Sequence, residues 1–197
     1  MIDPASLAPR ELYQLMINCV VPRPIALVTS LSPQGVVNAA PFSFFNAVSG
    51  APPIVMISVG KRKGVQKDTS SNILHSKEFV VHIVNETIAE QMNITSGSLS
   101  PDESEILRAG FTLIPCSKIK TPRIVESPVQ MECKLVQHVE LGDGAVDVIF
   151  GEVVALHLQD GLLKDGRIDP ADVRAIGRLG GMQYCRTRDT FEMQRPL

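Results

Sequence analysis

Cationic and hydroxyl side chains that suit phosphate binding concentrate in the first third of this 197-residue chain. Two groups, Lys61-Arg62-Lys63 and Lys67-Asp68-Thr69, follow a strand-like apolar run, and the second opens a short predicted helix. A phosphate binds positive side chains, hydroxyls and free backbone N–H groups, and a helix N-terminus beside Lys and Arg supplies all three. Two interpretations of this pattern are about equally favoured. One is a phosphate site, and the other is a solvated turn followed by an ordinary helix start.

The segment before these basic groups has the composition of a core but not its regularity. The run GVVNAAPFSFFNAVSGAPPIVMIS (35–58) contains Asn38 among apolar residues and is interrupted at Pro41. Proline removes an N–H and interrupts strand pairing, which leaves neighbouring backbone groups able to bond a ligand. The small residues Ala39 and Ala40 let a flat ligand approach the main chain. We therefore expect one edge of a sheet to be held open here.

Other reactive side chains in the sequence favour structural roles. The four histidines lack metal-ligand spacing, and His82 and His157 lie inside strand patterns, where hydrogen-bonded structural roles are expected. Cys133 lies on the apolar face of a strand and is expected in the core. The four cysteines are far apart and lack a C-x-x-C motif, which fits neither a zinc site nor a disulfide framework and predicts a reducing cytoplasm. The glycines after Arg178 do not form G-x-G-x-x-G, so a Rossmann dinucleotide site is not expected.

The composition is that of an ordinary globular protein. Apolar residues make up 44%, charged residues 20%, and the net charge is −2. These values give no indication of nucleic-acid or membrane-surface binding, and neither a signal peptide nor a membrane-spanning run is recognisable. We expect one domain over 1–197.

The elements that must position the polar residues are mostly strands. Apolar and polar residues alternate over 129–141, a Gly-Asp-Gly turn follows, and 146–158 forms the partner strand. In the strand at 129–141, the polar face would carry Gln130 and Glu132. Further strands are expected at 24–30, 36–45, 52–59 and 79–84, without a βαβ rhythm. Many strands joined by short turns predict a mainly β barrel or sandwich with peripheral helices.

Several short helices are predicted from their capping residues. An N-terminal helix is expected over about 6–18, with Pro9 in its first turn. Asp68 or Thr69 would cap the helix after the basic groups, Asn85 the next, and Asp169 the last. A further helix has the signature SPDESEILRAG, with Ser100 as cap, Pro101 at the first position, Glu103 completing a capping box and Gly110 as its end.

An ordered set of segments resembles a known family. These segments are PRPIALVTS, GVVNAAPFSFFNAVSGAPPIVMIS, KDTSSNI, FVVHIV, SPVQMECKL, FGEVVAL and GRLGGMQY. Over 22–184 they resemble the flavin reductase-like, FMN-binding split-barrel proteins, the group that includes flavoredoxin. The resemblance implies a Greek-key split β-barrel with its core over about 22–160, a C-terminal segment at 161–197, and a homodimer with FMN near the subunit interface.

The resemblance also implies the cofactor contacts. The ribityl-phosphate would face Thr29 and Ser30. The isoalloxazine and the ribityl chain would lie along Asn38, Ala39, Ala40, Pro41, Ser43 and Phe44. The phosphate would approach Ser58 and Arg62, with Lys67, Asp68 and Thr69 closing that end. Lys61 and Lys63 are not distinguished from Arg62 by sequence, and Arg178 and Tyr184 match a C-terminal motif without an assigned role.

The implied activity is that of an NAD(P)H-dependent flavin reductase. Hydride would pass from NAD(P)H to flavin N5, and electrons would then pass to free flavin, a partner oxygenase or another acceptor. One alternative is an FMN-binding electron carrier or flavin store without NAD(P)H activity of its own. A pyridoxamine-phosphate oxidase-like enzyme shares the barrel class, but PRPIALVTS and NAAPFSFFN resemble the flavin reductase branch. The sequence leaves open NADH against NADPH, the acceptor, and whether flavin is a tight cofactor or a substrate.

Overall fold

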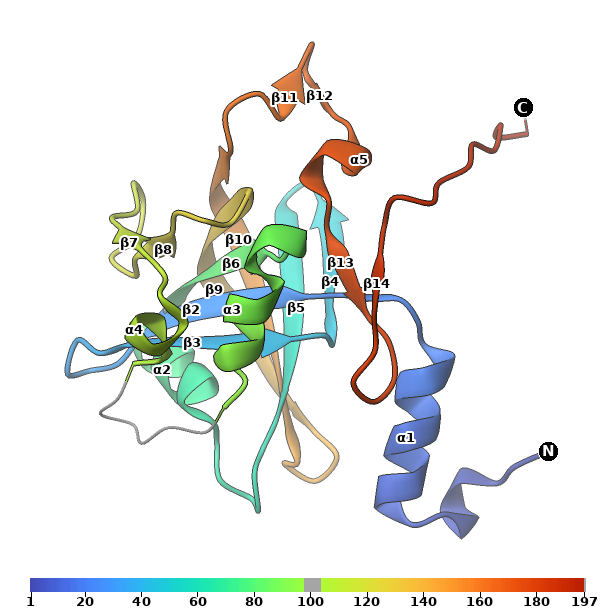
Figure 1. The fold of residues 1–197 in the computed structure, drawn as a ribbon. Helices are drawn as coiled ribbons and strands as arrows, with labels where there is room; N and C mark the ends of the chain where they lie inside the picture. Colours follow the sequence, from blue (N-terminus) through green and yellow to red (C-terminus); the bar gives the residue numbers. More distant parts are fainter. Residues whose placement is uncertain (98–103, 197) are drawn as a thin grey trace.

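A seven-stranded antiparallel sheet forms the centre of the computed structural model, which describes residues 1–97 and 104–196 (Figure 1). The strand order is β3-β2-β6-β9-β10-β5-β4. Its members are β2 (Ala26–Leu31), β3 (Val37–Phe42), β4 (Phe45–Gly50), β5 (Pro53–Gly60), β6 (Glu78–Ile83), β9 (Val129–Leu141) and β10 (Val146–Leu158). Every strand pairing in the described ranges is antiparallel, as the sequence predicts.

The two edge strands of this sheet are neighbours in the sequence. Only Ser43 and Phe44 separate β3 from β4, so the two edges meet at this end. The Phe44 carbonyl accepts the N–H of Ser58 on β5 at 2.8 Å, which ties the connection to the far side of the sheet. A sheet whose edges are joined by two residues must curl. This topology is the predicted Greek-key split β-barrel.

The β9–β10 hairpin confirms the clearest strand prediction. Its bounds are those expected, and Cys133 is completely buried in the core. The polar face is not solvated along its whole length, because Gln130 and Glu132 are also buried. The backbone N–H groups of Ser117 and Lys118 donate to the Glu132 carboxylate, so the chain segment around residues 117–118 covers this end.

Hydrophobic clusters cover both faces of β2. Ala26 and Val28 pack with Phe79 inside the barrel, whereas Leu27 packs with Met92 and other residues of the helical layer. Because both faces of the strand are covered, its sequence is a continuous apolar run rather than an alternating one. The strand is therefore a rigid support for β3, to which it is hydrogen-bonded.

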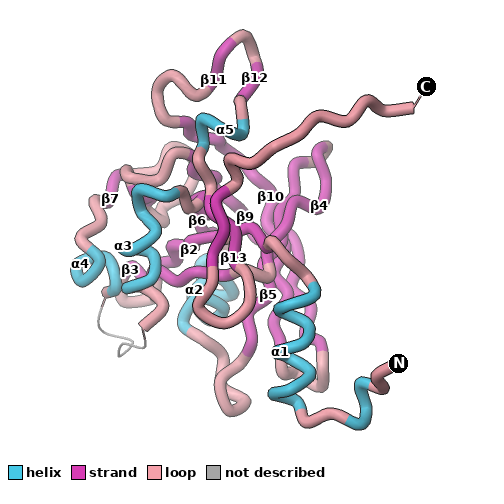
Figure 2. The backbone as a smooth tube through the Cα atoms, turned by 45° about the vertical axis from the view of Figure 1, so that its right-hand side comes forward, coloured by secondary structure: helices cyan, strands magenta, loops and turns pink. Residues whose placement is uncertain are grey.

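Five α-helices surround the described part of the sheet. They are α1 (Pro9–Cys19), α2 (Asp68–Ser76), α3 (Ala89–Ile94), α4 (Glu105–Ala109) and α5 (Pro170–Val173). The N-terminal helix begins at Pro9 rather than near residue 6, because Pro4–Ser6 forms a separate 3-10 turn, η1. In Figures 1 and 2, α1 lies apart from α2, α3 and α4. No helix in the described ranges is long and apolar enough to span a bilayer.

The predicted helix caps are partly confirmed. The side chains of Asn85 and Asp169 accept backbone N–H groups as expected, the first at η2 (Glu86–Ile88) and the second at α5. The expected cap of α2 is wrong, because Lys67 is the N-cap and makes no side-chain capping bond. The Ser100, Pro101 and Glu103 capping box lies outside the described residues, and α4 begins after Ser104 and ends at Gly110.

Short strands complete the fold. A three-stranded sheet of β1 (Arg23–Pro24), β13 (Ile176–Arg178) and β14 (Tyr184–Arg186) joins the N- and C-terminal segments. The loop between β13 and β14 packs against α1 (Figure 2), and a Cβ added at Gly180 would lie 1.8 Å from Asn18 Oδ1. Two small hairpins are β7 (Leu113–Ile114) with β8 (Arg123–Ile124), and β11 (Leu163–Lys164) with β12 (Arg167–Ile168).

Candidate functional site

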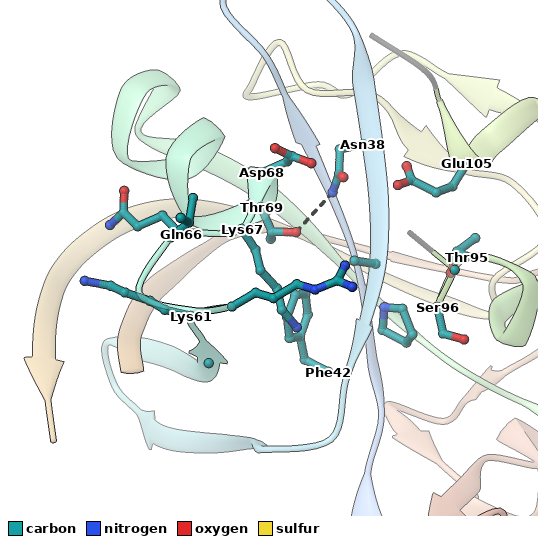
Figure 3. Close-up of a pocket in the computed structure, with 16 residues that line it drawn as sticks. Asn38, Phe42, Lys61, Gln66, Lys67, Asp68, Thr69, Thr95, Ser96 and Glu105 are labelled. Carbon is teal, nitrogen blue, oxygen red and sulfur yellow. Dashed lines mark hydrogen bonds between the residues drawn. The ribbon is translucent and has the colours of Figure 1, made fainter. Parts of the chain in front are cut away.

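A cavity of about 770 Å³ lies between β3, the segment after β5, the start of α2 and the ends of α3 and α4 (Figure 3). Seven of the thirteen predicted contact residues line it: Asn38, Ala40, Pro41, Arg62, Lys67, Asp68 and Thr69. The fold thus brings the small residues of β3 opposite the basic groups that follow β5.

The structure distinguishes the positions of Lys61, Arg62 and Lys63, which the sequence could not distinguish. Lys61 lines the cavity, but its ammonium lies 2.8 Å from Glu140 Oε1, and this hydrogen bond raises the pKa of Lys61. Lys63 has a positive φ of 51° in a tight turn and does not line the cavity. Arg62 and Lys67 are the other lining cations, and Lys67 Nζ lies 5.8 Å from the ring centroid of Phe42.

The start of α2 presents backbone donors next to this basic wall. The first intrahelical bond joins the Ser71 N–H to the Lys67 carbonyl, so the N–H groups of Asp68 and Thr69 have no helix carbonyl to bond. Thr69 is held in place by Asn38, whose Nδ2 donates to Thr69 Oγ1 at 3.0 Å (Figure 3). Cationic side chains, orphan N–H groups and the helix dipole together favour an anion at this end.

The opposite wall carries a carboxylate and hydroxyls that sequence reasoning missed. Glu105 is buried and accepts the N–H of Ala39 at 3.0 Å, which satisfies an outward-facing donor of edge strand β3. Burial raises the pKa of Glu105, and the nearby charge of Asp68 raises it further. Thr95 and Ser96 also line this side, across from Lys67 (Figure 3). Glu105 lies in the helix signature at 100–110, but neither that signature nor the residues around Thr95 and Ser96 indicate a position opposite β3.

Six of the thirteen predicted contact residues lie outside the lining of this cavity, and four of them are Thr29, Ser30, Ala39 and Ser58. Thr29 is completely buried and donates to the Pro122 carbonyl at 2.8 Å, and Ser30 is completely buried and accepts from Asn72. Ala39 presents its backbone to Glu105 while its side chain is buried, and Ser58 stands within β5. Ser30 therefore braces α2, and Thr29 braces the loop that precedes β8. The cavity gives no support to their predicted contact with a ligand.

A smaller cavity of about 220 Å³ continues from the first, and the two share Pro41, Phe42 and Ser96. Ser43, Arg178 and Tyr184 line this second cavity. Phe44 is 43% exposed, and its ring centroid lies 6.5 Å from that of Tyr13. Of the two remaining predicted residues, Ser43 thus lines the neighbouring space, and Phe44 lines neither cavity.

The histidines inside strands have the expected structural roles. His82 is completely buried, its Nδ1 lies 2.9 Å from the Leu27 carbonyl, and its Nε2 accepts the Ile124 N–H. Burial lowers the pKa of His82 to about 4, so the ring is neutral and Nδ1 carries the donated proton. His157 bonds the buried Glu132.

Comparison with known proteins agrees with this architecture. The model of the flavin reductase like domain matches residues 17–172. An uncharacterized protein of Halalkalibacterium halodurans is 42% identical over 99% of this chain and 96% of its own length.

Two solved structures are also similar. Nitrilotriacetate monooxygenase component B from Bacillus cereus has a TM-score of 0.96 at 38% identity, with 98% of each chain covered. The 2-nitrobenzoate 2-nitroreductase NbaA of Pseudomonas fluorescens has a TM-score of 0.91 at 37% identity, covering all of this chain and 96% of NbaA. The family match and these neighbours confirm the resemblance seen in the sequence motifs, and the chain belongs to the flavin reductase like domain family.

Proposed function

We propose that this protein is an FMN-dependent oxidoreductase that takes hydride from NAD(P)H and passes electrons to free flavin or another acceptor. The observation that carries the proposal is the larger cavity, in which a basic wall with orphan N–H groups faces a strand of small residues. This donor set fits a phosphorylated planar cofactor, and the family membership supports a flavin.

The chain's residues would divide the work of holding FMN. Arg62, Lys67 and the N–H groups at the start of α2 would bind the phosphate through charge-assisted hydrogen bonds. Ala40 and Pro41 leave room beside the β3 backbone for the planar ring. Glu105 on the opposite wall disfavours an anion there, which would orient the phosphate toward α2. When bound, FMN would supply the redox chemistry, accepting hydride and releasing electrons.

The names of two neighbours support an electron-transfer role but suggest different acceptors. One is called a component of a monooxygenase and the other a nitroreductase. The alternative function is an FMN-binding electron carrier or flavin store, which would need the same phosphate-binding wall but no reaction with NAD(P)H. The cavity supports both functions equally, so kinetics must separate them.

The test is anaerobic reduction of the purified protein. After saturation with FMN, it is mixed with NADH or NADPH, and the visible absorbance of the flavin is followed. Rapid bleaching by either nucleotide is expected. A protein that takes up no FMN would overturn the whole proposal. If the protein takes up FMN but both nucleotides bleach it only slowly, the reductase is excluded and the electron-carrier alternative is supported.

We further propose that the chain folds as one domain over 1–197 and works in the cytoplasm as a homodimer. Four unpaired cysteines support the reducing compartment. The dimer is supported by α1, whose side chains Leu15 and Met16 are 40% and 52% exposed although they are apolar. A second subunit over α1 would bury them.

A further inference from the structure

The smaller cavity is built from segments that are far apart in the sequence. Tyr13 comes from α1, Ser43 from the connection between the two edge strands, and Asn93 from α3. Arg178 and Tyr184 come from the β13–β14 hairpin. At about 220 Å³, the cavity is smaller than the 300–1,000 Å³ typical of drug-sized ligands, so its size suits one ring.

One guanidinium group, that of Arg178, lines this cavity, and a second, that of Arg23, lies behind the lining residue Ser43. Neither has a carboxylate partner among the described residues. Arg23 is 5% exposed and donates only to uncharged oxygens, namely the carbonyls of Ile17, Val20 and Leu179 and, at 3.4 Å, Ser43 Oγ. Arg178 donates to the Gly181 carbonyl. Burial of a positive charge without a counterion is costly.

The two arginines also affect each other. Burial lowers the pKa of Arg23; the nearby Tyr13 opposes this change, and the charge of Arg178 lowers the pKa further. An anion bound between the hydroxyl of Ser43 and Arg178 would relieve this repulsion. No carboxylate stands among the cavity's described lining residues to compete with it.

Arg178 is oriented for recognition of a planar anion. Its guanidinium carbon lies 4.4 Å from the ring centroid of Tyr184, and the bond to Gly181 fixes the same group from the other end. A guanidinium carries five N–H donors in a planar fork that matches a carboxylate. Tyr13 and Phe42 add aromatic surface to the same cavity, which favours a flat ring next to the charged group.

We propose that the smaller cavity binds a planar single-ring carboxylate, with Arg178 pairing with the carboxylate and Arg23 supplying a second positive charge beneath Ser43. The shared wall of Pro41, Phe42 and Ser96 sets this ligand next to the larger cavity. Its role as a substrate beside FMN rests on the proposed function, whereas its binding does not.

The test compares benzoate with benzamide, a neutral molecule of the same shape. Each is titrated by calorimetry into the full-length protein, first as purified and then saturated with FMN. Benzoate should bind at least about tenfold more tightly, since a charge-assisted pair adds more than about 1.4 kcal/mol. The chain has no Trp and only two Tyr, Tyr13 and Tyr184, and both line this cavity. A change in tyrosine fluorescence during the titration therefore reports a ligand bound near one of these two side chains.

Arg178→Gln should abolish the preference for benzoate, and Arg178→Lys, which keeps the charge but loses the fork, should retain part of it. Arg167→Gln on β12 is the matched control and should bind like the wild type. Equal affinities for benzoate and benzamide, or an unchanged preference in a folded Arg178→Gln variant, would overturn the inference. If pyrophosphate displaces bound benzoate at a concentration below that of benzoate, the cavity would instead be assigned to a nucleotide phosphate. Benzoate binding by a protein that takes up no FMN would keep the inference and remove only the proposed function.

Discussion

Arg62 is the residue through which the phosphate assignment can be tested most directly. It lines the larger cavity beside the start of α2, where charge-assisted bonds to a phosphate are expected. Arg62→Ala should weaken FMN binding by about tenfold or more, since such bonds contribute about 1.5–3 kcal/mol, while riboflavin binding changes by less than about twofold. Flavin fluorescence quenching measures both affinities. Lys63→Ala, on the same turn but outside the cavity, is the control, and equal weakening of FMN and riboflavin would remove Arg62 from this role.

Ala40 tests whether the ring lies against β3. Its side chain is half-buried at the cavity, and the residue pairs with Val28 on β2. Ala40→Leu would fill the space predicted for the ring and should reduce FMN affinity by about tenfold or more without unfolding the domain. Calorimetry gives the affinity and thermal unfolding checks the fold. Ala47→Leu on the exposed strand β4 should bind normally, and undiminished binding by a folded Ala40→Leu protein would exclude close contact at this position.

At this scale the sequence predicted residue types well and contacts less well. Arg62 and Thr69 were identifiable because guanidinium and hydroxyl groups near a helix start suit a phosphate, and Asn38 was identifiable from the family resemblance. All three line the cavity. Glu105 was not identifiable, because its partner is a backbone N–H 66 residues away. The burial of Thr29 was equally hidden, since the partner of its hydroxyl is the Pro122 carbonyl in a distant loop.

Among the elements, the β9–β10 hairpin depends on a glycine where the strands change register. The pairing of β9 with β10 shifts between Phe150 and Gly151, and a Cβ on Gly151 would lie 2.4 Å from Phe79 Cζ. Gly151→Ala should therefore lower the free energy of unfolding by about 1–3 kcal/mol through overpacking. Urea denaturation measures the loss. Gly50→Ala, whose added Cβ would meet nothing within 4 Å, should change stability little, and equal values for the two variants would contradict the packing argument.

The loop between β7 and β8 is held by the buried Glu132, and the ionisation of this carboxyl should make stability depend on acid pH. Burial raises the pKa of this carboxyl, but bonds from Ser117, His157 and Lys118 outweigh burial and lower the pKa to about 2, against 4.5 for an ordinary Glu. Because the folded pKa is depressed, the stabilisation is complete above about pH 5 and is lost as the pH falls toward 2.

Glu132→Gln isolates this effect. The substitution should lower the free energy of unfolding by about 2 kcal/mol at pH 7, since hydrogen bonds to a charged group are lost. The difference from the wild type should shrink at pH 3, where the wild-type advantage is already reduced. Urea denaturation at the two pH values gives both numbers. Glu152→Gln, an exposed residue of the same hairpin, should follow the wild type at both. A difference that is constant with pH would mean that Glu132 is not ionised in the folded protein.

The whole molecule explains why the 35–58 segment combines apolar, small and polar residues. It supplies both edges of the central sheet, and the edges meet at Ser43 and Phe44. Strand β3 is paired on one side only, so Ala40 and Pro41 line the larger cavity, and Phe42 lines it while also packing into the core. Alternation within strands was predictable from periodicity, whereas the closure of the sheet was implied only by the family resemblance, because it depends on pairings between strands that are distant in the sequence.

The apolar side chains exposed on α1 suggest a subunit interface, which a measurement of the oligomeric state would test. The exposed fractions are 52% for Met16 and 54% for Val20, one helical turn apart, and the helix lies apart from α2, α3 and α4. In sedimentation experiments the wild type should have twice the mass of one chain. Met16→Glu would place a charge in an apolar interface and should weaken self-association by about 100-fold or more. Gln14→Glu, at a polar exposed position of the same helix, should remain a dimer. A monomeric wild type would refute the homodimer, and a dimeric Met16→Glu protein would place the interface away from this face of α1.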